Sequence, residues 1–165
     1  MFVKLSEICD IVPGFAFKSK DFSSFGFPVI KIANICPPYV DNKNCSYVDL
    51  SNYDRNKLTK YIVERNDVLL AMTGATIGKI GKVLSGCSYI NQRVAKFLPK
   101  GNISKNYIYY VLSSNKFSNY VINNIDSSSA QPNISANSIG RYSFYLQNET
   151  ERRHIVDTRR TNYAN

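Results

Sequence analysis

The stretch LLAMTGATIGKIGKV, from Leu69 to Val83, constrains the fold more than any other part of the chain. It follows acidic and polar residues and holds three glycines, two lysines and two threonines. The segment ERNDVLLAMTG predicts a turn, a buried strand and a second turn, and Lys79–Leu84 predicts another short strand. Since glycine tolerates backbone conformations that other residues avoid, the stretch is typical of two strands joined by a tight turn.

A phosphate-binding loop is the competing interpretation of glycines and a lysine after a strand. A P-loop requires G-x-x-x-x-G-K followed by Ser or Thr, whose hydroxyl binds Mg²⁺. Gly74 and Gly78 are one residue too close for that spacing, and Ile80 stands where the hydroxyl is needed. No apolar strand ending in Asp follows as a Walker B segment would. The sequence therefore excludes a nucleotide site of this kind.

Other apolar segments predict further strands separated by polar turns. Residues 27–35, FPVIKIANI, predict one buried strand, and residues 88–99, SYINQRVAKFLP, predict another. Residues 141–146, RYSFYL, predict the last strand. Residues 36–58 hold two prolines and several Asn and Asp, so we expect mostly loop there, with a short helix at DRNKL after Ser51 or Asn52.

Two segments predict helices. Ser104 is a favoured N-cap residue, and apolar residues on one helical face continue from there to Ile125, with polar residues at 115 and 118 interrupting the stripe. This pattern predicts one long core helix. Residues 127–140 predict a polar loop, and residues 149–160 begin a C-terminal helix with acids ahead of bases. The fold class is α+β: a mixed or antiparallel β-rich domain with one long core helix.

The charge distribution favours a polyanionic partner. The chain has 165 residues, enough for one domain, and a net charge of +9. From Val68 to Ile125 there are seven Lys or Arg and no Asp or Glu. Basic residues clustered in this way, with 12 Tyr and 9 Phe available, favour nucleic acid. A basic surface that serves only solubility is the alternative.

The sequence also indicates a cellular compartment. The segment MFVKLSEICDIV mixes charged with apolar residues, so we expect no signal peptide, and no apolar run approaches the ~20 residues of a membrane helix. The spacing of Cys9, Cys36, Cys45 and Cys87 matches no zinc pattern and is typical of reduced thiols. We therefore expect a cytoplasmic domain that does not enter a membrane.

Catalytic chemistry finds little support. The sequence CPPY, from Cys36 to Tyr39, resembles the Asn/Asp-Pro-Pro-aromatic loop of amino-methyltransferases, but a cysteine is a weak partner for an amino group and their cofactor-binding glycine motif is missing. His154 is the single histidine and lies among arginines. The acidic residues are scattered rather than clustered for two metal ions. We expect no catalytic centre and no metal site in the chain.

Recognition of DNA remains as the interpretation that uses the polar residues near turns. Short polar side chains there suit hydrogen bonds to phosphates or base edges: Thr73, Thr76, Asn91, Gln92, Gln131 and Asn133. Basic side chains suited to phosphates are Lys18, Lys20, Lys79, Lys82, Arg93 and Lys96.

Each group has a structural alternative. The two lysines after the glycine turn are equally well explained as a solvated strand face. Gln92 and Arg93, within a predicted strand, are alternatively explained by hydrogen bonds to a neighbouring loop. Loop capping is the alternative for Gln131 and Asn133.

Taken in order, several segments resemble the target recognition domain of the specificity subunit of type I restriction–modification systems. The resemblance covers about residues 3–157 and rests on KLSEICDIVPGFAFKSKDF, GFPVIKIANI, ERNDVLLAMTGATIGKIGKV, NQRVAKFLP, the helix around YIYYVLSSNKF, SSSAQPNIS and ERRHIV. The glycine-rich segment and the pair NQR…P and SAQPNIS are its most specific parts. In this family TGATIGK is a turn between two strands, which leaves Lys79 at most a phosphate contact.

The resemblance implies a function without catalysis. Such a domain reads one half of a split target in double-stranded DNA. It needs no cofactor of its own, because S-adenosylmethionine is used by methyltransferase subunits and ATP with Mg²⁺ by a restriction subunit. We therefore expect both kinds of subunit as partners. Residues 1–148 correspond to the recognition domain, and residues 149–165 correspond to the start of a spacer helix.

Two departures from the family leave alternatives open. Family subunits usually carry two recognition domains, spaced by long helices that form a coiled coil. Here ERRHIVD is followed by TRRTNYAN, which is polar and has no apolar stripe. We expect either a half-subunit that pairs with a second recognition domain or a second copy, or a truncated fragment. The rival functions are a decoy that binds methyltransferase subunits and a small nucleic-acid-modifying enzyme that uses CPPY.

Overall fold

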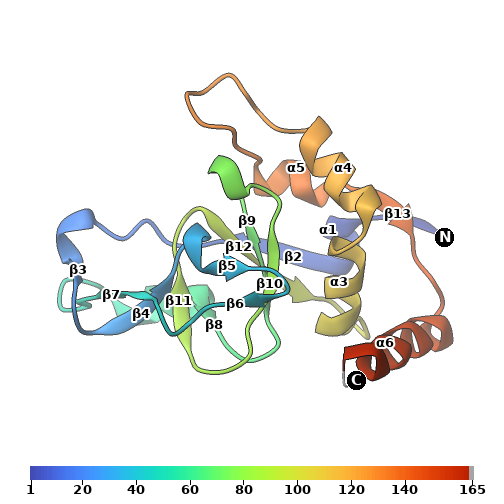
Figure 1. Cartoon of the computed structure of the whole chain (residues 1–165), viewed down its shortest axis with the longest axis horizontal. Coiled ribbons are helices and arrows are strands. Elements are labelled where there is room, and N and C mark those ends of the chain that lie inside the picture. Colours follow the sequence, from blue (N-terminus) through green and yellow to red (C-terminus); the bar gives the residue numbers. More distant parts are fainter. Residues whose placement is uncertain (164–165) are drawn as a thin grey trace.

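The structure, a computed structural model, describes residues 1–163 and the side chains of residues 1–160 (Figure 1). The strands are β1 (Phe2–Lys4), β2 (Cys9–Pro13), β3 (Phe22–Ser23), β4 (Phe27–Ile30), β5 (Ile35–Cys36), β6 (Tyr39–Val40), β7 (Ser46–Val48), β8 (Ile62–Val63), β9 (Val68–Ala71), β10 (Ile80–Lys82), β11 (Ser88–Ile90), β12 (Val94–Pro99) and β13 (Ser143–Tyr145). The helices are α1 (Leu5–Ile8), α2 (Arg55–Leu58), α3 (Lys105–Leu112), α4 (Asn115–Asn123), α5 (Ala136–Gly140) and α6 (Glu149–Tyr163). Short 3-10 turns occupy Ser19–Asp21, Ile32–Asn34, Thr59–Tyr61 and Gly74–Thr76.

Three sheets organise these strands. The largest has the order β2-β12-β9-β10-β6-β5, the second has the order β3-β7-β4-β11-β8, and β1 pairs with β13. Neighbouring strands are antiparallel except β10 with β6 and β11 with β4. The helices α3, α4 and α5 lie on one side of the large sheet, and α6 packs beside α3 (Figure 1). The predicted α+β class with a mixed, largely antiparallel β arrangement is confirmed.

Strand β9 shows why the large sheet has a core on both faces. All four of its residues are buried. Val68 and Leu70 point into a cluster with the helices, whereas Leu69 and Ala71 point into a cluster that includes residues of β4 and β11. An uninterrupted apolar run is what a strand covered on both faces requires. The glycine-rich turn that follows β9 therefore starts from a rigid support.

Two strands predicted as continuous are each divided, so both predictions are wrong. Residues 27–35 form β4 and β5 in different sheets, because the Asn34 side chain accepts a hydrogen bond from Lys31 N at 2.9 Å and closes a 3-10 turn between them. Residues 88–99 form β11 and β12, also in different sheets. They are separated by a turn in which Val94 N donates to Asn91 O at 2.9 Å.

The predicted long helix is also divided, into α3 and α4. Ser104 caps α3 as predicted, since its hydroxyl accepts from Tyr107 N at 3.1 Å. Ser114 caps a second helix in the same way and accepts from Phe117 N at 3.2 Å. The extended backbone that an N-cap residue adopts is incompatible with a continuous helix. The stripe expected to reach Ile125 therefore ends at Val121, the last of its residues that is buried.

Several segments predicted as loop contain short elements. Residues 36–58 include part of β5 as well as β6, β7 and α2, and α2 begins after Asp54 rather than after Ser51 or Asn52. Residues 127–140 include α5, which Ser135 caps by accepting from Ser138 N at 3.0 Å. Helix α2 lies within DRNKL, as predicted, whereas the predictions missed β6, β7 and α5, each of which is five residues or shorter.

The predicted C-terminal helix is confirmed as α6. Its Ile155 and Val156 pack against the core cluster that contains Val68 and Leu70. The guanidinium of Arg152 donates to Gln147 O at 2.6 Å. The division at residue 148 stays a prediction, and residues 164–165 of the predicted tail lie outside the described residues. Within the described part of the chain, no helix has the length and apolarity to cross a membrane.

Candidate nucleic-acid interface

The glycine-rich turn after β9 is joined to the segment SAQPNIS. Gly74 N and the Thr73 hydroxyl both donate to Pro132 O, at 3.1 and 2.9 Å. Ile134 N donates to Met72 O at 3.0 Å, so the contact continues on either side. The positive φ of Gly74, 75°, is the conformation predicted for a glycine in this turn. Two segments about 60 residues apart in sequence therefore form one unit (Figure 1, green and orange).

The turn at residues 91–93 joins the same unit. Met72 N donates to Arg93 O at 2.9 Å, and Asn91 N donates to Ile30 O at 3.0 Å. Gly14 lies so close to this turn that a Cβ atom there would be 2.2 Å from the carbonyl oxygens of Ile90 and Asn91. The position of the turn is thus fixed by backbone contacts on three sides.

A fourth turn completes the arrangement. A Cβ atom at Gly74 would lie 3.6 Å from Ile32 Cδ1, which places the 3-10 turn Ile32–Asn34 beside the glycine turn. We call the four together the turn edge: residues 32–34, 73–76, 91–93 and 131–134. These turns come from four separate parts of the chain and meet where β9 ends.

The turn edge presents polar side chains that make no hydrogen bond or ion pair with the described residues. Gln92, Arg93 and Gln131 are exposed, and Asn133 is half-buried. Within the described part of the chain, no hydrogen bond or ion pair uses the side chain of any of these four residues, although the backbones of Arg93, Gln131 and Asn133 take part in hydrogen bonds. The structural alternatives, a hydrogen bond to a neighbouring loop and loop capping by the side chain, therefore find no support. The predicted location of Gln92 and Arg93 inside a strand is wrong, because both lie in the turn between β11 and β12.

The two threonines have different surroundings. Thr73 is 5% exposed and its hydroxyl is committed to Pro132 O. The Thr76 hydroxyl is buried as well and has no hydrogen-bond partner among the described residues. Both hydroxyls are covered by protein, so in this conformation the threonines shape the turn edge from within and do not face a ligand.

Lys18 and Lys20 lie next to the turn edge. They flank Ser19 in the turn Ser19–Asp21, and Ser19 shares a pocket with Gln92 and Arg93. Both lysines are exposed. This turn is held in place because the Tyr53 hydroxyl accepts from Lys18 N at 3.0 Å and donates to Asp21 Oδ2 at 2.6 Å.

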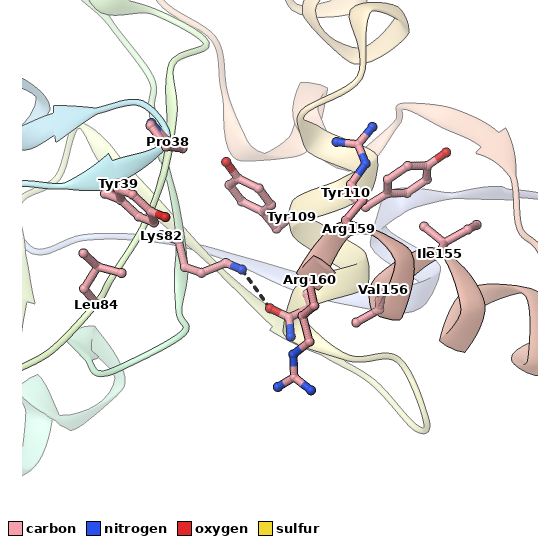
Figure 2. A pocket seen from close by; sticks show the side chains of 11 residues that line it. Pro38, Tyr39, Lys82, Leu84, Tyr109, Tyr110, Ile155, Val156, Arg159 and Arg160 are labelled. Atoms are coloured by element: carbon pink, nitrogen blue, oxygen red, sulfur yellow. Dashed lines mark hydrogen bonds between the residues drawn. The ribbon is translucent and has the colours of Figure 1, made fainter. Parts of the chain in front are cut away.

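The two lysines after the glycine turn are separated by the structure. Lys79 is exposed, directly beyond the turn Gly74–Thr76. Lys82 points instead into a groove of about 280 Å³ between β10 and α6 (Figure 2). Its ammonium donates to Asn106 Oδ1 at 2.8 Å and lies 4.6 Å from the centre of the Tyr109 ring. Burial and the neighbouring Arg160 lower the pKa of Lys82, so a fully solvated strand face does not describe this residue.

Lys96 serves the fold rather than a surface. It is 6% exposed, and its ammonium donates to Ile62 O at 2.7 Å. Burial lowers the pKa of Lys96 despite the opposing effect of Asp67. In this conformation the ammonium is engaged by a backbone carbonyl and the side chain is buried, so the structure gives no support to a phosphate contact by Lys96.

The residues weighed for catalysis do not come together. Cys36 is exposed, and Pro37–Pro38 of the CPPY segment is a cis peptide. His154 is exposed on α6. Among the residues that the structure describes, no three His, Cys, Asp or Glu side chains are grouped in a way that would hold a metal ion.

Sequence reasoning missed one basic residue at this edge, Lys31. It lies where β4 ends, and its ammonium is 3.9 Å from the centre of the Phe22 ring. The prediction of a continuous strand over residues 27–35 concealed it. The available signal was the lysine itself, which interrupts the apolar run FPVIKIANI.

Comparison with known proteins assigns the chain to a family. Residues 1–158 match the model of the type I restriction modification DNA specificity domain. The specificity subunit of the type I restriction enzyme MjaVIII of Methanocaldococcus jannaschii is 31% identical over 121 residues, which are 70% of this chain and 28% of that protein. The specificity subunit of EcoAI of Escherichia coli is 30% identical over 162 residues, 93% of this chain and 26% of that protein. The chain thus spans about a quarter of the length of these relatives.

Solved structures share the fold. A chain from a study of complex assembly and conformational transition of the type I R-M system has a TM-score of 0.71 at 18% identity, covering 99% of this chain and 39% of that one. The HsdS subunit of Thermoanaerobacter tengcongensis has a TM-score of 0.68 at 19% identity, covering 96% of this chain and 36% of that one. Sequence, motifs and fold agree: the chain belongs to the family of type I restriction modification DNA specificity domains.

Proposed function

We propose that this chain is a DNA-recognition domain that reads one half of a bipartite target and carries no catalytic activity. The observation that supports the proposal is the turn edge, where Gln92, Arg93, Gln131 and Asn133 gather with side chains that make no hydrogen bond or ion pair with the described residues. Arg pairs with the major-groove edge of guanine, and Gln or Asn pairs with that of adenine. Rigid turns with unengaged side chains of these types are suited to reading bases.

The charges near the turn edge support the same proposal. The four ion pairs among the described residues use Lys100, Lys105 and Arg153 as cations, and none involves the predicted phosphate contacts. Lys18, Lys20, Lys79 and Arg93 are exposed and keep their charge available for phosphates. Contacts to phosphates fix the register of a protein on a duplex, and contacts to base edges supply the specificity.

The partners follow from the family and remain part of the proposal. Because the curated relatives are specificity subunits of type I restriction enzymes, we propose methyltransferase and restriction subunits as partners in the cytoplasm. S-adenosylmethionine and ATP with Mg²⁺ belong to those subunits. A second recognition domain, or a second copy of this chain, supplies the other half of the target.

Selection from a randomised duplex pool tests the proposal. The chain is incubated with the pool at two salt concentrations, with and without a methyltransferase subunit, and the bound DNA is sequenced. We expect a short enriched motif and binding that weakens steeply with salt. Asn52→Ala, an exposed change outside the turn edge, is the matched control and should leave the motif intact. Binding to the methyltransferase subunit without any motif would contradict the proposal and support a decoy.

A further inference from the structure

A pocket of about 410 Å³ opens between the turn Ser19–Asp21 and residues 91–93. It is lined by the cations Lys31 and Arg93, by the polar Ser19 and Gln92, and by the rings of Phe17 and Phe22, with no Asp or Glu in its lining. We propose that this pocket binds a backbone phosphate of duplex DNA, held by the Lys31 ammonium, the Arg93 guanidinium and the Ser19 hydroxyl. The inference rests on the proposed function and assigns Lys31 a role in it.

Lys31 is held in place before any ligand arrives. Its backbone N–H donates to Asn34 Oδ1 at 2.9 Å, and the buried Asn34 is itself anchored because its Nδ2 donates to Asn44 O at 3.2 Å. The ammonium lies 3.9 Å from the centre of the Phe22 ring, which is within cation–π range. A charge fixed in this way loses little side-chain freedom on binding.

The sheet brings Arg93 to the same pocket. Ile30 pairs with Ile90 in the parallel register of β4 and β11, so the chain leaves both strands side by side at Lys31 and Asn91. The carbonyl of Arg93 is fixed by Met72 N, whereas its guanidinium makes no hydrogen bond or ion pair with the described residues. One cation is therefore anchored and the other is free to close on a ligand.

The pocket holds positive charge that nothing in its lining balances. The carboxylate nearest in sequence to the lining residues belongs to Asp21, which precedes Phe22. Asp21 is 8% exposed and accepts from the Tyr53 hydroxyl at 2.6 Å. Burial and the hydrogen bond to Asp21 raise the pKa of Tyr53, so this hydroxyl keeps its proton at neutral pH. A phosphate accepts hydrogen bonds from ammonium, guanidinium and hydroxyl donors alike, and such charge-assisted bonds are strong.

A base edge is the competing occupant, since Arg93 also suits guanine. A phosphate and a base edge in this pocket would respond differently to a substitution of its cations. Loss of a phosphate contact weakens binding to all sequences and reduces the salt dependence, whereas loss of a base contact relaxes the sequence preference.

The test measures affinity for the selected duplex over a series of salt concentrations. Lys31→Met should reduce the slope of log K against log salt by about 0.9, which corresponds to an about eightfold weaker affinity at 0.1 M salt. Arg93→Met should reduce the slope by the same amount, and Lys31→Arg should retain the wild-type slope. Lys57→Met, the same charge change at an exposed lysine of α2 outside the pocket, should have no effect.

The possible failures are distinguishable. If the wild-type chain binds DNA and both methionine variants keep its slope, the pocket assignment is overturned while the proposed function stands. If Lys31→Met or Arg93→Met alters the selected motif, a base and not a phosphate occupies the pocket, and the assignment is overturned. If the wild-type chain does not bind DNA at any salt concentration, the proposed function falls and the inference with it.

Discussion

Gly14→Ala should disturb the turn that carries Gln92 and Arg93 without touching either residue. The new Cβ atom would lie 2.2 Å from the carbonyl oxygens of Ile90 and Asn91, whereas ordinary contact begins near 3.4 Å. Because the obstructing atoms belong to the backbone, no side-chain rotation relieves the clash. The two segments must therefore separate by about 1.2 Å.

The expected cost can be worked from the contacts at this position. Overpacking of a tight site costs about 1–3 kcal/mol. The separation also weakens the hydrogen bonds from Gly14 N to Val94 O and from Phe15 N to Ile90 O, both 2.9 Å long. Each such bond contributes about 0.5–1.5 kcal/mol. We expect the free energy of unfolding to fall by about 3 kcal/mol, measured by urea denaturation.

The control for this prediction is Gly101→Ala. A Cβ atom there meets nothing within 4 Å, and the positive φ of 58° alone should cost about 1–2 kcal/mol. DNA selection on both variants then separates stability from recognition, since only the change at Gly14 displaces the turn edge. A Gly14→Ala variant with wild-type stability and an unchanged motif would show that Gly14 does not hold this turn in place.

Further predictions concern the helix cap, the thiols and a buried lysine. Ser114→Ala should lower the free energy of unfolding by about 1 kcal/mol through loss of the α4 cap, and Ser114→Asn should restore most of it; equal urea midpoints for all three chains would contradict this. A thiol reagent should modify the exposed Cys36 and Cys87 in the folded chain, but Cys9 only after unfolding, because burial raises its pKa to about 12; rapid labelling of Cys9 in the native chain would show that this core is open. Burial lowers the pKa of Lys96 below its ordinary 10.5, so the native state loses this proton at a lower pH than the unfolded state does. The contribution of Lys96 to the free energy of unfolding therefore rises as the pH increases toward 10.5. Lys96→Met should remove this rise, seen as the difference between the two chains in denaturation curves at alkaline pH.

The fold class could be predicted because the strongest sequence patterns have local causes. The run before Thr73 is apolar at every position, which a strand buried on both faces requires, and β9 is such a strand. Ser104 at the start of α3 and Gly74 and Gly78, both with positive φ, also act through local backbone chemistry. These features depend on neighbouring residues and are therefore visible in the sequence.

The breaks between elements could not be predicted in the same way. The polar residues within segments 27–35 and 88–99 do not by themselves show that each segment serves two sheets, because the change of sheet is set by pairing with distant strands. Ser114 caps α4, yet a serine inside a helical pattern is equally compatible with a continuous helix. Lys31 was missed for the same reason, because its contacts with Asn34 and Phe22 exist only in the folded turn.

The site was predicted in part because its residue types and turn signals are local, while their grouping is not. Gln92, Arg93, Gln131 and Asn133 meet at the turn edge through backbone bonds that join separate segments. Thr73 and Lys96 have the same polar character in the sequence, but tertiary packing covers both. Residue type alone therefore could not distinguish the candidate DNA contacts that are exposed from those that are buried in the fold.

Selection with paired variants tests whether the turn edge reads DNA. The wild-type chain, Gln92→Ala, Gln131→Ala and the control Asn52→Ala are each taken through the same randomised duplex pool. We expect one motif for the wild-type and control chains, and a relaxed preference at different base pairs for each glutamine variant. An identical motif for all four chains would contradict DNA reading by the turn edge, because sequence would then be read elsewhere on the molecule.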